Sequence, residues 1–304
     1  MYTPRELAEY AAFRAAVTAL GAIPLPTAQR IGARLARALF DRGGKRVHYV
    51  LTNLAIAFPD LPEEERRRIG RESYVNLAFS LIDIARGRNW TAEEVRSRFE
   101  IEGLEIADAV LGAGKGAVAV TMHIGCFEIM VRAVPAYGIP VTVVVRAIGN
   151  RLLRDELQRQ RTSTGAEVVL HRNVLPKMLR AVKQGRAVAL LNDQYARRSR
   201  GCFVPFLGVR ASTSLGAAVV ALRTGAPIVP VYSLRVEPDH HHMVIRPPLD
   251  FPDTGDRRKD AELLTARCND VLGEIIRAHP EQWMWSHRRF RHSPDLPGDP
   301  YGGR

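Results

Sequence analysis

The sequence contains no long uninterrupted apolar run. A membrane-spanning helix needs about 18 or more consecutive apolar residues, and no stretch of the chain provides them. The first residues also carry no secretory signal with a cleavage site. The nearest approach is the segment 7–25, which is rich in alanine and leucine but is interrupted by Glu9 and Arg14. This segment is typical of an interfacial helix lying on a bilayer or, equally, of an amphipathic helix packed on the protein.

Cysteine is also scarce. Cys126, Cys202 and Cys268 are too few and too scattered to predict a disulfide framework or a zinc site, and a reducing cytoplasm is the simplest setting. The consecutive histidines at 240–242 do not change this, because adjacent residues cannot easily chelate one ion. We therefore predict no metal. The motif G-x-S-x-G is missing, and the glycine-rich 112–116 lacks the serine or threonine that a phosphate-binding loop needs after its lysine.

Acidic residues are outnumbered by basic ones. The chain has 44 Lys and Arg against 32 Asp and Glu, which gives a formal net charge of +12. Such an excess favours anionic partners: a membrane surface, an acidic carrier protein, a phosphorylated lipid or nucleic acid. If the N-terminal region lies on a membrane, four of its arginines would face the anionic headgroups, namely Arg14, Arg30, Arg34 and Arg37.

Two other segments combine basic and apolar residues. In 197–210, basic residues flank an apolar centre, which suits a lipid with a phosphorylated head and a fatty tail or, alternatively, a loop packed on the core. In the tail, 279–294, Trp283 and Trp285 precede three arginines. That cluster predicts contact with a membrane interface or with nucleic acid, and a buried tryptophan anchor with a solvated basic end is the alternative.

The secondary-structure pattern changes near residue 100. Before it, proline breaks and capping residues separate helical patterns over 1–40 (two helices), 45–57 and 63–85, and a short helix follows Thr91. After it, apolar runs at 117–122, 141–145, 167–170, 187–192, 228–235 and 242–245 read as strands, with helical patterns at 128–137, 151–162, 174–184 and 214–223 between them. The alternation predicts an α/β core with a largely parallel sheet. We expect a helical region over 1–100, the core over 101–292 and a tail over 293–304.

A histidine and a glutamate follow the first of these strands. His123 and Glu128 are five residues apart, so on one continuous helix they would diverge by about 140°, and they can meet only if His123 lies on the turn before the helix. Gly125 permits such a turn and lets a substrate come close. A histidine held by a carboxylate can take a proton from a hydroxyl. By spacing alone the pattern is weak, and two side chains that merely cap a helix are the simpler interpretation.

Other polar residues directly follow the predicted strands. Arg146 follows 141–145, and Asp193 with Gln194 follows 187–192. Because ligands of parallel sheets bind at the carboxyl ends of the strands, His123, Arg146 and Asp193 could gather at one edge. Arg146 could bind a phosphate or a developing oxyanion, or form an ordinary salt bridge. Asp193 could be a catalytic or orienting carboxylate, or could cap the following turn.

Six segments resemble, in the same order, one family: the lysophospholipid acyltransferase-like enzymes of the lipid A lauroyl/myristoyl transferase type, which are related to bacterial phosphatidylinositol mannoside acyltransferases. The matches are NLAIAFPDLPEEERRRI (53–69), MHIGCFE (122–128), VVVRAIGN (143–150), LLNDQ (190–194), VPFLGVRASTSLGAAVVALRTGAPIVPV (204–231) and HPEQWMWSHRRF (279–290). Six ordered matches are far more specific than any one, and they favour the catalytic interpretation of the histidine. The sequence departs from the family at Cys126-Phe127, where lipid A enzymes usually have Asn-Trp.

The resemblance implies a glycerolipid acyltransferase-like fold and transfer of an acyl group from acyl carrier protein or coenzyme A to a hydroxyl of a membrane glycolipid or phospholipid. It implies no cofactor beyond the acyl thioester, no nucleic-acid partner, and a location on the cytoplasmic face of the bacterial inner membrane as a peripheral or monotopic protein. His123 would be the general base and Glu128 would orient it. The remaining expected site residues are those that bind substrate or the oxyanion: Gly125, Arg146, Asp193, Gln194, Pro205 and Phe206.

Two rival functions stay open at this point. Cys126 lies at a predicted helix start beside His123, where thiol pKa values fall, so it could carry the acyl group covalently. Alternatively, the charge and the Trp/Arg tail suit a non-catalytic protein that binds anionic lipid or nucleic acid.

Overall fold

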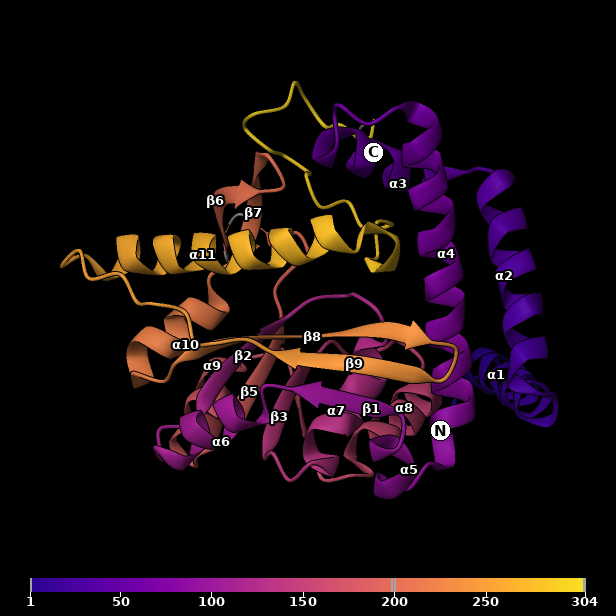
Figure 1. Cartoon of the computed structure of the whole chain (residues 1–304), viewed down its shortest axis with the longest axis horizontal. Coiled ribbons are helices and arrows are strands. Elements are labelled where there is room, and N and C mark those ends of the chain that lie inside the picture. Colours follow the sequence, from indigo (N-terminus) through magenta and orange to yellow (C-terminus); the bar gives the residue numbers. More distant parts are fainter. Residues whose placement is uncertain (1, 198, 200, 303–304) are drawn as a thin grey trace.

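The N-terminal part of the chain is helical. The computed structural model describes residues 2–197, 199 and 201–302 (Figure 1). Its first helices are α1 (Pro4–Ala22), α2 (Leu25–Asp41), α3 (Lys45–Ala57) and α4 (Glu63–Arg86), followed by the 3-10 turn η1 (Gly87–Asn89) and α5 (Ala92–Arg96). The predicted break near Pro24 and the predicted N-cap at Thr91 are confirmed, and Thr91 forms a full capping box with Glu94.

A seven-stranded sheet forms the centre, in the order β1-β9-β8-β2-β5-β3-β4. The strands are β1 (Phe99–Glu102), β2 (Ala117–Thr121), β3 (Val141–Val145), β4 (Glu167–Leu170), β5 (Ala187–Leu191), β8 (Ile228–Glu237) and β9 (His240–Ile245). Neighbouring strands are parallel except β8 and β9, which form an antiparallel pair. The predicted α/β class with a largely parallel sheet is confirmed.

Helices cover both faces of this sheet (Figure 1). One face packs against α6 (Leu104–Gly112) and α7 (Phe127–Ala136), and the other against α9 (Leu175–Lys183), α10 (Gly216–Thr224) and α11 (Arg257–Ala278). The twelve-residue α8 (Arg151–Thr162) connects β3 to β4. Residues of α3 and α4, including Leu54 and Ile69, belong to the same buried cluster as Val120 of β2. The helical region and the sheet therefore share a core.

Five elements were missed by the sequence prediction. They are β1, α6, α11 and the antiparallel hairpin of β6 (Gly201–Phe206) and β7 (Val209–Ser214). Alternating charge makes FEIE a weak strand pattern, and the hairpin contains Pro205 and a run of serine and threonine. The first hundred residues are consequently helical only as far as β1.

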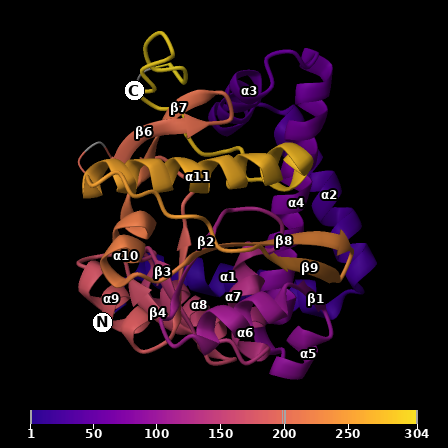
Figure 2. The same cartoon turned by 60° about the vertical axis from the view of Figure 1, so that its left-hand side comes forward.

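The hairpin and the C-terminal segment lie side by side, on the other side of α11 from the sheet (Figure 2). Arg210 of β7 forms an ion pair with Asp295, and its carbonyl accepts a hydrogen bond from Ser293. A short 3-10 turn, η3 (Pro280–Gln282), leads from α11 back to the sheet edge. The segment that follows α11 is thus brought to the carboxyl ends of β2 and β5, where Met284 N–H donates to the carbonyl of His123.

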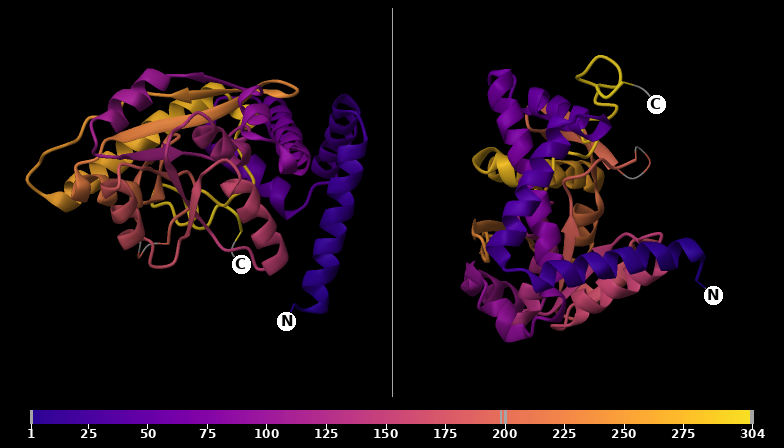
Figure 3. Two further views of the ribbon diagram at one scale, coloured as in Figure 1. Left: turned by 90° about the horizontal axis from the view of Figure 1, so that it is seen from below. Right: turned by 90° about the vertical axis from the view of Figure 1, so that its right-hand side faces the viewer.

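The two N-terminal helices lie along one side of the molecule (Figure 3). In α1, Val17 is buried while Leu7 is exposed, and α2 packs on α4 through residues such as Ala33 and Phe40. Within the described residues, no helix combines the length and the apolar character needed to cross a membrane.

Candidate active site

The sheet register brings a histidine and an aspartate together. Thr121 of β2 is paired with Leu191 of the parallel neighbour β5. His123 and Asp193 each stand two residues beyond that pair, so they emerge beside each other at the carboxyl ends of the strands. His123 Nδ1 lies 2.9 Å from Asp193 Oδ1, and the His123 backbone N–H donates to Oδ2 at 2.9 Å. The predicted gathering at this edge is confirmed for these two residues.

Asp193 is buried and fully engaged by its neighbours. Besides His123, the indole N–H of Trp283 donates to Oδ2 at 2.8 Å. Burial raises the pKa of the Asp193 carboxyl, but the charge and hydrogen bonds of His123 and the Trp283 bond outweigh it and bring the pKa down to about 2. Asp193 is therefore a fixed anion at neutral pH, and it selects the His123 tautomer that carries its proton on Nδ1.

The imidazole ring of His123 is partly exposed and has two close neighbours. The amide Nε2 of Gln194 lies 3.2 Å from His123 Nε2 and 3.4 Å from Nδ1, so the amide lies over the ring rather than in line with one nitrogen lone pair. The His123 side chain keeps 15% of its surface exposed, and the ring of Phe127 meets it edge-on at 4.9 Å between centroids. With its proton on Nδ1, His123 has a lone pair on Nε2 with which it can accept a proton.

Glu128 lies elsewhere in the site. Its carboxylate forms a two-pronged pair with Arg161 of α8, with distances of 2.5 Å to Nε and 2.9 Å to Nη2. The expectation that Glu128 orients the imidazole differs from this geometry, in which the carboxylate on His123 is that of Asp193. Helix α7 begins only at Phe127, so Glu128 projects from its first turn toward α8.

Gly125 is required by the path of the backbone. Its φ is +54°, and a Cβ there would lie 2.1 Å from the carbonyl oxygen of Ser233 on β8. Its N–H donates to the carbonyl of Gln282 at 3.0 Å, and its own carbonyl accepts from Ser80 at 2.9 Å. The predicted turn before the helix is confirmed. The Gly125 amide, however, already has a partner, so it does not point freely at a substrate.

Two further residues, Arg146 and His287, are close enough to affect the electrostatics of the site. Arg146 follows β3, the strand beyond β5, and its side chain is exposed. His287, from the C-terminal segment, is close enough for Asp193, His123 and Arg146 all to influence its charge. Burial lowers the pKa of His287 to about 4; the negative charge of Asp193 opposes this shift, and the positive charges of Arg289, His123 and Arg146 add to it. A neutral imidazole therefore adjoins the pair at neutral pH.

The hairpin supports the site from behind. Phe206 is fully buried, with its ring 5.9 Å from that of Trp283 and the guanidinium of Arg289 4.3 Å from its centre. Pro205 is exposed, and its carbonyl accepts from Asn269 of α11 at 2.9 Å. Phe206 thus packs on the tryptophan that holds Asp193, and it has no surface of its own to offer a substrate.

The structure decides between the two interpretations of the tail. Trp283 and Trp285 are buried, with 2% and 0% of their surface exposed, and their rings meet edge-on at 4.5 Å between centroids. Arg289 is also completely buried and donates to Ser212 and Thr213 of β7. The predicted contact of this cluster with a membrane or nucleic acid is wrong for these side chains, because they form the core beneath the site.

The described part of the basic and apolar segment 197–210 also packs within the protein. Val204 and Leu207 are buried in the hairpin, and Arg210 is paired with Asp295. Two of the basic residues predicted to form a rim, Arg198 and Arg200, lie outside the described residues.

Sequence reasoning missed two polar contributors, Trp283 and His287. Both lie in the segment 279–290, about 90 residues further along the chain than Asp193. The tryptophan was recognised as an anchor candidate, but nothing in the local pattern indicates that its indole N–H reaches a carboxylate. The hydrogen bond from Met284 N to His123 O at 3.0 Å and the isolated bridge between Ile124 and Trp283 bring this segment into place.

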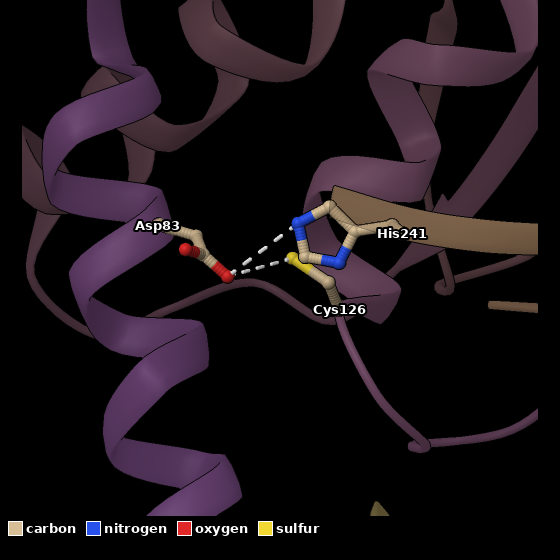
Figure 4. Close-up of side chains that lie close together, drawn as sticks. All are labelled: Asp83, Cys126 and His241. Atoms are coloured by element: carbon tan, nitrogen blue, oxygen red, sulfur yellow. Dashed lines mark hydrogen bonds and ion pairs between the residues drawn. The ribbon is translucent and has the colours of Figure 1, made fainter. Parts of the chain in front are cut away.

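A second polar cluster lies behind the turn that follows His123 (Figure 4). It consists of Asp83 from α4, Cys126 at the start of α7 and His241 from β9, and all three are buried. Burial, and then the charge of Asp83, raises the pKa of the Cys126 thiol well above its ordinary value. The expectation of an activated thiol at the helix start is wrong, because desolvation and the neighbouring carboxylate disfavour the thiolate.

A histidine fixed by a buried carboxylate at the carboxyl edge of a parallel sheet is the arrangement of an α/β enzyme that activates a hydroxyl group. The chain belongs to the bacterial lipid A biosynthesis acyltransferase family, whose model matches residues 3–292. Membership of this family makes the protein an O-acyltransferase. The family expected from the six ordered segments is confirmed.

Curated relatives cover most of the chain. The lipid A biosynthesis lauroyltransferase of Escherichia coli K12 is 29% identical over 277 residues, which cover 90% of this chain and 88% of the relative. The palmitoleoyltransferase of the same organism is 26% identical over 274 residues, covering 90% and 87%. Its myristoyltransferase is 22% identical over 274 residues, covering 89% and 83%. Transferases named for three different acyl groups are thus similar to this protein over nearly the same part of its sequence.

Proposed function

We propose that this protein transfers a fatty acyl group from an acyl thioester, carried by acyl carrier protein or coenzyme A, to a hydroxyl of a lipid A precursor. The observation that carries this proposal is the His123–Asp193 pair at the sheet edge, with the His123 side chain partly exposed. The family and its lipid A relatives support the acceptor class.

In the proposed reaction His123 acts as a general base. The acceptor hydroxyl gives its proton to His123 Nε2 as its oxygen attacks the thioester carbonyl carbon. The C–O bond forms, the C–S bond breaks, and the imidazolium returns the proton to the departing thiolate. Asp193 stabilises the imidazolium throughout, because it is a buried anion already bonded to Nδ1.

The developing oxyanion needs a donor, and Arg146 is the best supported one. The amide of Gly125 is bonded to Gln282, the amide of Ile124 to Met122, and the amide of His123 to Asp193. Arg146 by contrast is exposed at the end of β3, and a guanidinium stays charged there. A well-placed donor of this kind contributes about 3 to 4 kcal/mol to transition-state stabilisation.

Glu128 takes a supporting role in this scheme. Its two-pronged pair with Arg161 joins the first turn of α7 to α8, and both side chains are 15% exposed. The pair holds the helix that follows the catalytic turn. We therefore treat Glu128 as a positioning residue rather than as the partner of His123.

The apolar cavity beside the sheet is too small for a fatty acyl chain. It is lined by residues such as Ala119, Met130 and Val141 and has a volume of about 60 Å³. A cavity of about 150 Å³ is what holds a benzene molecule. This cavity could therefore take up an acyl chain only if the surrounding helices moved.

The membrane contact we propose involves α2 more than α1. Ile31, Leu35 and Leu39 are exposed at four-residue intervals on α2, so they form one stripe, and Arg30 and Arg34 stand beside it. An exposed apolar stripe next to basic side chains suits the surface of an anionic membrane. This contact would keep the protein on the cytoplasmic face of the inner membrane, as a peripheral protein.

The test is a comparison of lipid extracts by mass spectrometry from cells that express the wild type, His123→Ala or, as a matched control, His242→Ala. We expect a lipid A precursor to gain one acyl mass with the wild type and the control, and the activity of the His123→Ala enzyme to fall about 10²- to 10⁴-fold. Purified enzyme supplied with acyl carrier protein or coenzyme A thioesters then identifies the donor. A folded His123→Ala protein with near-normal turnover would exclude the proposal.

A further inference from the structure

We propose that Asp83, Cys126 and His241 form a binding site for one Zn²⁺ ion. The three residues come from α4, from the start of α7 and from β9, and their ligand atoms all lie within 4.8 Å of one another. Figure 4 shows the thiol of Cys126 and the imidazole of His241 both close to one carboxylate oxygen of Asp83. Thiolate, imidazole and carboxylate are the ligands that zinc prefers in proteins.

The spacing suits a tetrahedral ion. With zinc–ligand bonds of about 2.0 to 2.3 Å, tetrahedral ligand atoms lie about 3.3 to 3.7 Å apart. Here Cys126 Sγ lies 3.2 Å from Asp83 Oδ2, and His241 Nε2 lies 3.9 Å from the same oxygen. Only small side-chain adjustments would bring all three atoms onto one ion, and one position would be left for a water.

His241 is the observation that points to a ligand. Its side chain is completely buried, and neither ring nitrogen has a hydrogen-bond partner among the described residues. A buried polar group without a partner costs free energy, commonly about 1 to 3 kcal/mol. The unsatisfied imidazole is aimed at the carboxylate and thiol (Figure 4), and an ion between them would use its lone pair.

Arg235 completes the arrangement as the outer partner of Asp83. Its guanidinium forms a buried ion pair with Asp83 Oδ2. A metal-bound carboxylate is ordinarily hydrogen-bonded by such a second group, which fixes its orientation. On binding, the Cys126 thiol loses its proton to solvent and the Zn–S bond replaces the S–H bond, so that the ion, the two anionic ligands and the Arg235 guanidinium together carry one positive charge.

The consequence would be a clamp on the catalytic turn. Cys126 is three residues from His123 and directly follows Gly125, so the ion would tie this turn to α4 and β9. The site does not depend on the proposed acyl transfer, and its test needs no substrate.

The test is metal analysis of the untagged full-length chain. We expect about one equivalent of zinc after dialysis against Zn²⁺, and loss of that zinc in Cys126→Ala and His241→Ala. The matched controls are Cys202→Ala and His242→Ala, a cysteine and a neighbouring histidine outside the cluster, which should retain it. Zinc should also raise the thermal midpoint of the wild type by several degrees and leave that of His241→Ala unchanged.

A spectroscopic measurement on the wild type tests the proposal even if the variants fail to fold. Wild-type protein loaded with Co²⁺ should show a thiolate-to-metal charge-transfer band in the near ultraviolet and the visible bands of a tetrahedral ion. Folded wild-type protein that takes up neither Zn²⁺ nor Co²⁺ would overturn the proposal. Zinc retained by both folded cluster variants would overturn it as well, because the ion would then lie elsewhere.

Discussion

Two buried carboxylates, Asp193 and Asp83, each lie near a histidine, and the two pairs are built differently. His123 and Asp193 share a hydrogen bond of 2.9 Å, and Asp193 also accepts a hydrogen bond from Trp283. His241 and Asp83 lie 3.9 Å apart, and the imidazole has no hydrogen-bond partner in the described part of the chain. The first histidine is partly exposed and the second is buried. The partly exposed histidine, whose carboxylate has a further hydrogen-bond partner, is suited to proton transfer. The buried histidine without a hydrogen-bond partner is suited to binding an ion.

The largest expected effect concerns the carboxylate of the first pair. Asp193→Asn should lower turnover about 10³- to 10⁴-fold, because an amide neither fixes the Nδ1–H tautomer nor stabilises the imidazolium. Glu128→Gln, which loses the pair with Arg161, should lower it no more than about tenfold. Single-turnover kinetics with saturating thioester would measure both. Equal impairment of the two variants would contradict the assignment of Glu128 to a positioning role only.

A change in the second pair, His241 and Asp83, should lower the stability of the protein rather than its turnover. Asp83→Asn leaves the buried guanidinium of Arg235 without its counter-charge, which costs about 3 to 5 kcal/mol. Urea unfolding followed by circular dichroism would measure this loss. Molecules that remain folded should keep most of their turnover. A folded Asp83→Asn protein as inactive as Asp193→Asn would remove the distinction between the two clusters.

A smaller loss of turnover than that of Asp193→Asn should come from changing the tryptophan that supports Asp193. Trp283→Phe retains an aromatic ring against Phe206 but removes one hydrogen bond to a buried anion, which is worth about 2 kcal/mol. We expect turnover to fall about tenfold or somewhat more. The control is Trp285→Phe, whose indole N–H donates instead to the carbonyl of Pro280. Equal losses of turnover in the two variants would indicate a packing effect alone.

Local patterns were sufficient for most elements. The runs 141–145, 151–162 and 167–170 were predicted with the bounds that the structure has. They are strongly patterned segments bounded by glycine, proline or a capping residue, such as Asn150 at the start of α8. The hairpin, β1 and α11 were missed; β1 and the hairpin gain their order from pairing with distant strands rather than from their own composition.

The residues of the site were predicted from the sequence, but their pairing was not. His123 and Asp193 were both recognised as residues that follow buried strands, and the rule for parallel sheets placed them at one edge. Which carboxylate meets the imidazole was not accessible, because that depends on β5 being the direct neighbour of β2. Glu128 was the candidate closest in sequence, whereas Asp193 is the one closest in space.

The sequence by itself determined the fold class, the family and the candidate base, because periodicity, strand-ending polar residues and ordered motifs are local properties of the chain. The tertiary structure alone decided the partner of His123, the burial of the tryptophans and the meeting of Cys126 with Asp83 and His241. Those three cluster residues are separated by 43 and 115 positions. Contacts over such separations are fixed by strand order and helix packing, which no short stretch of sequence specifies.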